Sequence, residues 1–249
     1  MRLPLRSPLR TSLATPLLLA LMAVAAVPAL GSSPANALSP QALAPLAQAA
    51  QRQAAELQRR YPAAELSWSE AMLGPVAITG LQIDVAGDNV ERKALEFAKL
   101  HAALWGIRGD DLRLWHTTRS RDRNSVRLNL TVPSNAGELI VLDRVLVVTF
   151  DGAGRLITVT SDLVPLGAAQ VGPISQAEAR QIATKAVFAG RESQVTSAGS
   201  ARLAAVASLQ TTQVVWAVDV VASRAIERYA VLVDSQTGAV LSKRPVAIH

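Results

Sequence analysis

The feature that most constrains the fold is a two-residue apolar alternation in the last third of the chain. It runs through three consecutive segments, Val214–Val220, Glu227–Asp234 and Ser235–Lys243. A period of two is that of a β-strand, in which successive side chains point to opposite faces. The polar stretch Asp234–Gly238 has the composition of a tight turn. We therefore expect three antiparallel strands with one large apolar face, which carries Trp216, Val218, Val220, Tyr229, Val231 and Val233.

Two helices are predicted from their start signals. Ser175–Glu178 and Asp88–Glu91 both have the spacing of a capping box, in which an oxygen-bearing residue precedes Glu by three positions. The stretch after Asp88 repeats apolar residues every three or four positions and ends at Gly106, which fits a left-handed helix cap. The second helix is expected to end at Gly190. A looser, alanine-rich helix is expected over Ser39–Tyr61.

The remaining segments favour strands and loops. One or two entry strands are expected within residues 64–86. An antiparallel sheet is expected from Leu112–His116, Val126–Val132, Leu139–Phe150 and Arg155–Thr160, with Asp143–Arg144 interrupting the third run and Asp151–Gly154 as a hairpin turn. Residues 191–200 are expected to form a loop and Leu203–Leu209 the first strand of the last sheet. The predicted fold class is α+β, with two helix-on-antiparallel-sheet modules in tandem behind a signal peptide.

The N-terminus has the composition of an export signal. A basic segment precedes the apolar stretch Leu13–Val27, and Ala35-Asn36-Ala37 fits the small-residue cleavage pattern. We expect a signal peptide over residues 1–37, a secreted or periplasmic protein, and no stable membrane insertion after cleavage. An uncleaved anchor is the alternative. Adjacent arginines of the twin-Arg type are missing, which favours export of the unfolded chain.

The charge of the chain does not favour nucleic-acid binding. Removal of Arg2, Arg6 and Arg10 with the signal segment lowers the formal charge from +6 to +3, and aromatic residues make up only 4% of the chain. The densest basic stretch, Arg119–Arg123, is expected to be a solvated hairpin loop, with a docking patch for an acidic partner as the alternative. We therefore expect no nucleic-acid partner.

No constellation in the sequence indicates catalysis. The chain has no Cys, no H-E-x-x-H, no G-x-S-x-G and no phosphate-binding glycine loop. His101 lies on the apolar helix face, which favours a core imidazole over a metal ligand. The carboxylates Asp84, Asp88, Asp110 and Asp111 lack calcium-loop spacing and are better explained by caps and turns. We therefore expect no enzyme activity, no cofactor and no metal site.

Two sets of motifs resemble a known pair of modules. The segments Ile174–Ala183, Trp216–Val220 and Tyr229–Leu241 resemble a PepSY domain, a small helix-on-sheet module. A second set resembles the fungalysin/thermolysin propeptide (FTP) module: Trp68, Gly74-Pro75, Gly80, Leu104–Ile107, Asp111–Leu114, Val147–Gly152 and Val159. Where such propeptides have a Gln-rich strand leading to a Gly-Val-Pro-Val turn, this chain has Asn129–Gly137.

The resemblance implies a domain order and a partner. The expected divisions are the signal peptide (1–37), a helical lead-in (38–63), the FTP-like module (64–164), a linker (165–174), the PepSY-like module (175–244) and a tail (245–249). In that family the two modules precede a zinc protease domain and act as its inhibitor and folding assistant. The resemblance thus implies an exported, non-catalytic protein that binds a secreted thermolysin-like or fungalysin-like metalloprotease in trans.

The residues expected to contact such a partner form the C-terminal tail. They are Arg244, Pro245, Val246, Ala247, Ile248 and His249, which could lie along the protease cleft as an extended strand. Two alternatives stay open. The chain could be the separated or truncated leader of a metalloprotease zymogen, or an envelope-associated binding or structural module unrelated to proteases.

Overall fold

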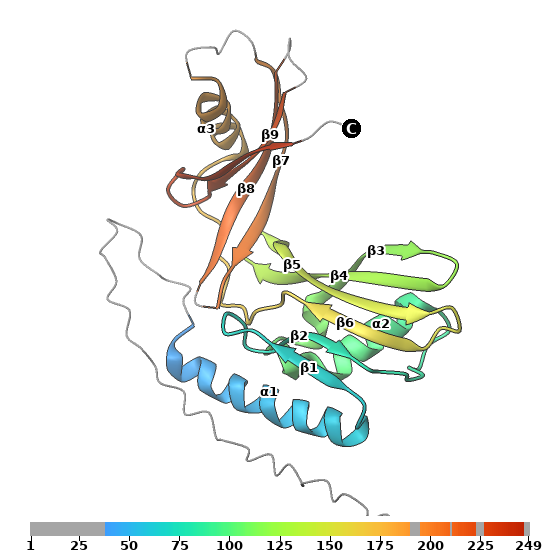
Figure 1. Cartoon of the computed structure of the whole chain (residues 1–249). Helices are drawn as coiled ribbons and strands as arrows, with labels where there is room; N and C mark the ends of the chain where they lie inside the picture. The colour runs from blue at the N-terminus through green and yellow to red at the C-terminus, as the bar shows by residue number, and fades with distance from the viewer. Residues whose placement is uncertain (1–37, 190–194, 210, 223–226, 247–249) are drawn as a thin grey trace, which may run out of the picture. The chain divides into compact units, whose positions relative to one another are not determined.

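The computed structural model describes residues 38–189, 195–209, 211–222 and 227–246. Figure 1 shows two sheet regions, the first with the helices α1 and α2 and the second with α3. The helices are α1 (Pro40–Arg60), α2 (Val90–Leu100) and α3 (Gln176–Phe188), with short 3₁₀ segments η1 (Ala102–Trp105) and η2 (Gly109–Asp111). The strands are β1 (Glu65–Trp68), β2 (Pro75–Thr79), β3 (Leu112–Arg119), β4 (Arg123–Ser134), β5 (Gly137–Asp151), β6 (Leu156–Ser161), β7 (Val195–Ala207), β8 (Thr212–Ala222), β9 (Arg228–Asp234) and β10 (Val240–Val246). The predicted α+β class is confirmed.

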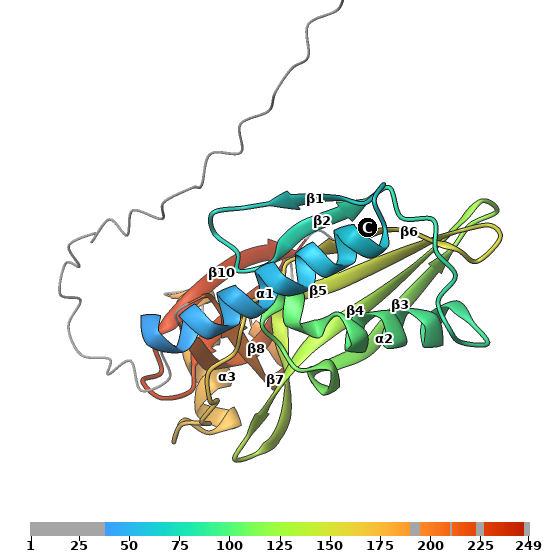
Figure 2. The same cartoon turned by 90° about the horizontal axis from the view of Figure 1, so that it is seen from below.

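The alanine-rich lead-in forms a long helix, as predicted. Ser39 caps α1 by accepting a hydrogen bond from the Ala42 amide, and Pro40 occupies the first turn, where its missing N–H costs nothing. The buried side of α1 presents Ala50, Ala54 and Leu57. Seen from below, as in Figure 2, α1 and α2 lie in front of the strands of the first sheet. Among the described helices, none has the length and apolarity needed to cross a membrane.

The helix α2 covers β3 and β4, but its start differs from the prediction. The N-cap is Asn89, whose side chain accepts from the Arg92 amide, and Asp88 lies outside the helix. Glu91 binds the Arg119 guanidinium at 2.6 Å instead of closing a capping box. The basic hairpin Arg119–Arg123 is therefore tied to α2 at one end. Gly106 does adopt the left-handed conformation, with φ of 64°, but it caps η1.

His101 is a core residue, as predicted. Its side chain is 5% exposed, and its ring lies 4.5 Å from that of Phe97, measured between centroids. Nδ1 is 3.2 Å from the Gln53 side-chain nitrogen, so the imidazole connects the end of α2 to α1. Burial, helped by the positive charge of Arg60 and opposed by Glu56, lowers the pKa of His101 to about 4. The imidazole is consequently neutral near pH 7.

Strand β5 is bent where Asp143 and Arg144 interrupt its apolar run. Both of its ends pair with β4, and the residues between Ile140 and Val145 form a bulge opposite a single position of β4. Asp143 has φ of 57°, a left-handed conformation that Asp tolerates better than most residues. The interruption seen in the sequence is therefore the point at which the strand changes direction.

The bend of β5 joins the two sheet regions. Val141 pairs with Ala205 in a parallel bridge between β5 and β7. The Arg144 guanidinium donates to the Ala207 carbonyl at 2.7 and 3.0 Å, and to the Asp162 carbonyl at 3.1 Å. Strand pairing is thus continuous in the order β1-β2-β6-β5-β7-β8-β9-β10. The tandem modules share this hydrogen-bonded junction.

The second region consists of α3 packed on the antiparallel strands β7–β10. The capping box predicted at Ser175 is present in full, because Ser175 and Glu178 each bind the other's backbone amide. Trp216 packs at the margin of the core and donates from Nε1 to the Ile174 carbonyl at 2.8 Å. The predicted loop over 191–200 is wrong for its second half, since β7 begins at Val195. The predicted cap Gly190 lies outside the described residues.

The segment that was predicted to be a linker is anchored along its length. Val171 donates from its amide to the Asn135 side chain, and the Gly172 amide donates to the Ser235 hydroxyl. A side chain at Gly172 would meet the Ser235 carbonyl oxygen at 2.0 Å, so only glycine fits there. The divergent turn within Asn129–Gly137 therefore contacts the connection between the two regions.

Candidate binding groove on the β7–β10 sheet

The structure places the first three residues of the predicted binding tail inside a strand. Arg244, Pro245 and Val246 belong to β10, with Pro245 opposite Tyr229. Among the described strands β10 pairs only with β9, so its outer edge is open. The other three predicted tail residues, Ala247, Ile248 and His249, lie outside the described residues.

The turn before β10 is held by Asp234. Its carboxylate accepts from the amides of Gln236 and Thr237 and from the Thr237 hydroxyl, and it is also bound by the Gln213 side chain. Burial would raise the pKa of Asp234, but these hydrogen bonds outweigh burial and lower the pKa below its ordinary value. Asp234 is therefore the turn residue that the sequence predicted, and it fixes where β10 begins.

The alternation seen in the sequence divides the β7–β10 sheet into two faces. One face, built around Val218, Val220, Val231 and Val233, packs against α3. Lys243 also reaches this side, donating to the Ala186 carbonyl of α3. The intervening residues point to the opposite face, over which the described part of the chain places no helix. That face is the candidate site.

A groove of about 440 Å³ lies on this open face. Its side chains form two rows across the four strands, as the pairing register and the hydrogen bond of Ser200 with Asp219 show. The first row is Arg202, Ala217, Leu232 and Ser242, and the second is Ser200, Asp219, Ala230 and Arg244. Leu142 and Asp143 enter from the bend of β5. The groove therefore depends on the junction as well as on the sheet.

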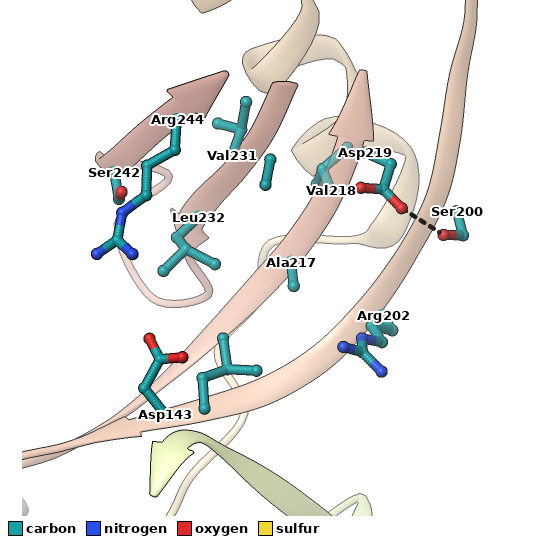
Figure 3. Close-up of a pocket in the computed structure, with 12 residues that line it drawn as sticks. Asp143, Ser200, Arg202, Ala217, Val218, Asp219, Val231, Leu232, Ser242 and Arg244 are labelled. Atoms are coloured by element: carbon teal, nitrogen blue, oxygen red, sulfur yellow. Dashed lines mark hydrogen bonds between the residues drawn. The ribbon is translucent and has the colours of Figure 1, made fainter. Parts of the chain in front are cut away.

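The hollow results from short side chains between long ones. Ala217 and Ala230 occupy the two central strands, while arginines stand on the outer strands β7 and β10. Figure 3 shows Arg202 and Arg244 on opposite sides of the hollow, with Ala217 and Leu232 between them. The first row thus has a small and apolar floor, the second row has Asp219 on β8, and each outer strand carries an arginine.

The charges of the groove are only partly matched within the described residues. Asp219 accepts from the Ser200 hydroxyl at 3.2 Å (Figure 3). It also accepts from Arg228 at 3.1 Å, so its charge is balanced locally. Arg202 and Arg244 are exposed and have no hydrogen bond or ion pair with any described residue. Guanidinium groups bind carboxylates in bidentate fashion. Asp143 is also exposed at the groove, on the bend of β5, and has no ion pair with a described residue, so the charge of the groove as a whole is mixed. Arg202 and Arg244 therefore offer two local positions for an anionic group, and Asp143 disfavours one beside β5.

Two of the four acidic residues considered in the sequence, Asp110 and Asp111, have side-chain contacts in the structure. Asp111 binds Arg108 at 2.8 Å, and Asp110 lies 3.7 Å from the Lys99 amine. In the described ranges, no three His, Asp or Glu side chains come together in a way that could hold a metal ion. These carboxylates therefore stabilise η2 and the end of α2.

A second hollow lies on the first sheet. It has a volume of about 220 Å³ and is flanked by the salt bridge between Arg113 and Glu138. Trp115 is 58% exposed there, because β3 has an irregular register at this residue. Sequence reasoning missed this tryptophan, which interrupts the expected alternation of its strand.

The groove residues were also missed as a set, although a signal for them existed. Ala217, Asp219 and the arginines occupy the positions that alternate with the apolar face, and two alanines at the strand centres leave space. Only Arg244 was singled out in advance, as part of the tail.

Comparisons with known proteins give no family assignment. No protein-family model matches the chain, and no curated protein matches it. Among solved structures, the chain is similar to the Bacillus megaterium YpeB C-terminal domain, with 11% sequence identity and a TM-score of 0.36. The match covers 86% of this chain and 100% of that one. No family model supports the FTP resemblance, which therefore stands on the residues quoted for it.

Proposed function

We propose that this protein is an exported, non-catalytic binding protein that engages a thermolysin-like or fungalysin-like zinc metalloprotease in trans, as an inhibitor or a folding assistant. The resemblance of both halves to propeptide modules motivates the choice of partner. The observation that carries the proposal is the position of Arg244–Val246 on the open edge of β10, beside the groove.

An open strand edge offers unpaired backbone groups to another chain. A partner can add a strand there by backbone hydrogen bonds, while neighbouring side chains supply specificity. Pro245 removes one donor from β10, which discourages continuous pairing with further copies of the same strand. Such an edge favours a selective partner over self-association.

The rest of the module holds this edge in place. Asp234 organises the turn that precedes β10, and Lys243 attaches the strand to α3. A preformed surface loses little entropy on binding, which is the property an inhibitor or a folding template needs. The strand β10 is therefore held at its start by the Asp234 turn and along its length by the hydrogen bond of Lys243 to α3.

The test is inhibition of a thermolysin-type protease. Full chain is titrated into thermolysin while cleavage of a fluorogenic peptide is followed, with a serine protease as the specificity control. We expect saturable inhibition of the metalloprotease only. Recovery of activity from denatured protease domain, refolded with and without the chain, measures the folding role.

Two variants locate the contact. Deletion of residues 247–249 leaves β10 intact, whereas deletion of residues 243–249 also removes most of that strand. We expect the longer deletion to weaken inhibition at least as much as the shorter one. Absence of both inhibition and refolding assistance in the parent chain would contradict the proposal and favour a module unrelated to proteases.

A further inference from the structure

The two arginines of the groove are too far apart along the sheet to hold one small anion by themselves. Arg202 is on β7 and Arg244 is on β10, with β8 and β9 between them. Three inter-strand spacings separate these strands by about 14 Å. In Figure 3 their guanidinium groups lie on opposite sides of the hollow instead of converging. They form two separate positions for carboxylates.

The floor between these positions has a different chemistry. Ala217, Ala230 and Leu232 present small or apolar side chains to the groove. An extended peptide that crosses the strands would place residues i, i+2 and i+4 on its sheet-facing side. Positions i and i+4 are then about 13 Å apart, close to the separation of the arginine-bearing strands.

The chain's own remaining segments do not offer such a ligand. The residues outside the described ranges contain a single acidic side chain, Glu192. One short segment of this chain therefore cannot supply two acidic side chains four positions apart. Of the two carboxylates that line the groove, Asp219 is already bound by Arg228 and Ser200. The other, Asp143, belongs to the bend of β5 and not to the four strands that carry the two arginines.

We propose that the groove binds an extended acidic segment of a partner protein, with acidic side chains at i and i+4 against Arg202 and Arg244 and an apolar side chain at i+2 over Ala217 and Ala230. The proposal rests on the proposed function only in taking the ligand to be part of another protein. It does not depend on the partner being a protease.

The experiment uses three fluorescein-labelled peptides of seven residues and the full chain at low salt. The first has Glu at positions 2 and 6 and Leu at position 4, with Ser elsewhere. The second replaces both Glu by Gln, and the third has its two Glu at positions 2 and 4 and its Leu at position 6. Fluorescence anisotropy measures each affinity.

We expect the first peptide to bind about tenfold more tightly than the Gln peptide, since each of the two exposed ion pairs is worth about a threefold gain in affinity. It should also bind more tightly than the peptide with closer Glu residues. Equal binding of the Glu and Gln peptides would overturn the proposal, and equal binding of the two Glu spacings would overturn the two-position geometry.

Substitutions assign the binding to the groove. Arg202→Gln and Arg244→Gln should each weaken binding of the first peptide about threefold, whereas Arg127→Gln removes an exposed arginine from β4 and should leave it unchanged. Ala230→Leu fills the floor without altering charge and should also weaken binding. If Arg127→Gln weakens binding as much as the groove variants do, the groove is not the site.

These outcomes separate the two proposals. Peptide binding that depends on Arg202 and Arg244, without inhibition of any metalloprotease, supports the groove and rejects the protease partner. If the chain inhibits the protease, both arginine substitutions leave inhibition unchanged and the acidic peptide is not preferred, the groove proposal is rejected and the protease proposal stands.

Discussion

The two helix-on-sheet regions follow one plan but bury different side chains. The core under α2 contains Phe97, Trp105 and Phe150, all 2% exposed or less. The core under α3 is built mainly of alanine and valine, and Phe188 is its single member among the largest fully buried side chains described. The difference predicts that the first region supplies most of the stability of the fold.

The largest effect should follow removal of the aromatic core of the first region. Trp105→Ala deletes a fully buried indole whose Nε1 donates to the Pro75 carbonyl at 3.0 Å. We expect a loss of about 3–5 kcal/mol in the free energy of unfolding, from the cavity and the unpaired carbonyl together. Urea denaturation measures it. Trp216→Ala, at a half-buried position, should lower the free energy of unfolding clearly less. An equal loss for the two variants would contradict the larger contribution of the first region to stability.

The next effect is a pH dependence confined to the first region. The pKa of His101 is lowered to about 4 in the folded state from 6.5, so the folded protein binds fewer protons than the unfolded chain between these values. The stability contributed by the neutral imidazole is complete above pH 6.5 and is lost as the pH falls toward 4. The loss amounts to about 3 kcal/mol.

The matched variant for this pH dependence is His101→Gln, which has no titrating group at that position. Unfolding free energies of parent and variant are compared at pH 7 and pH 4. Carboxylates titrate in both proteins, so the difference between the two pH profiles reports His101. Identical profiles would show that the imidazole does not stay neutral in the core.

A smaller effect is expected at the junction between the regions. Arg144→Gln removes the guanidinium that binds the carbonyls of Ala207 and Asp162. We expect a loss of about 2 kcal/mol, together with faster amide hydrogen exchange in β7. Arg127→Gln is the control, because Arg127 is exposed on β4. Unchanged exchange in β7 would mean that strand pairing alone holds the junction.

The smallest effect distinguishes two candidate caps of α2. Asn89→Ala should cost about 1 kcal/mol, because the Asn89 side chain binds the Arg92 amide, whereas Asp88→Ala should cost little. Thermal unfolding of both variants measures the difference. Ser175→Ala at the full capping box of α3 provides the reference loss in the second region.

Local patterns predicted much of the fold, since strand alternation and capping spacings are properties of neighbouring residues. The hairpins, the three helices and the core position of His101 followed from them. The groove did not, because it depends on which strands become neighbours. Arg202 and Arg244 are brought onto one surface only by the order β7-β8-β9-β10. The start of β7 was missed because Ser197–Ser200, which follow its first two residues, are small and have little strand preference.

The parallel bridge of β5 with β7 also predicts an order of assembly. Arg144 and its acceptor Ala207 are 63 residues apart in the chain, whereas β4 and β5 close across a tight hairpin. Contacts between distant residues form late, because a long loop must first be ordered. During synthesis from the N-terminus, the edge of β5 that pairs with β7 stays unpaired until the C-terminal third of the chain has been made. An unpaired strand edge can pair with the wrong strand during this interval. The bend at Asp143 shortens the straight part of β5 to which another strand could pair.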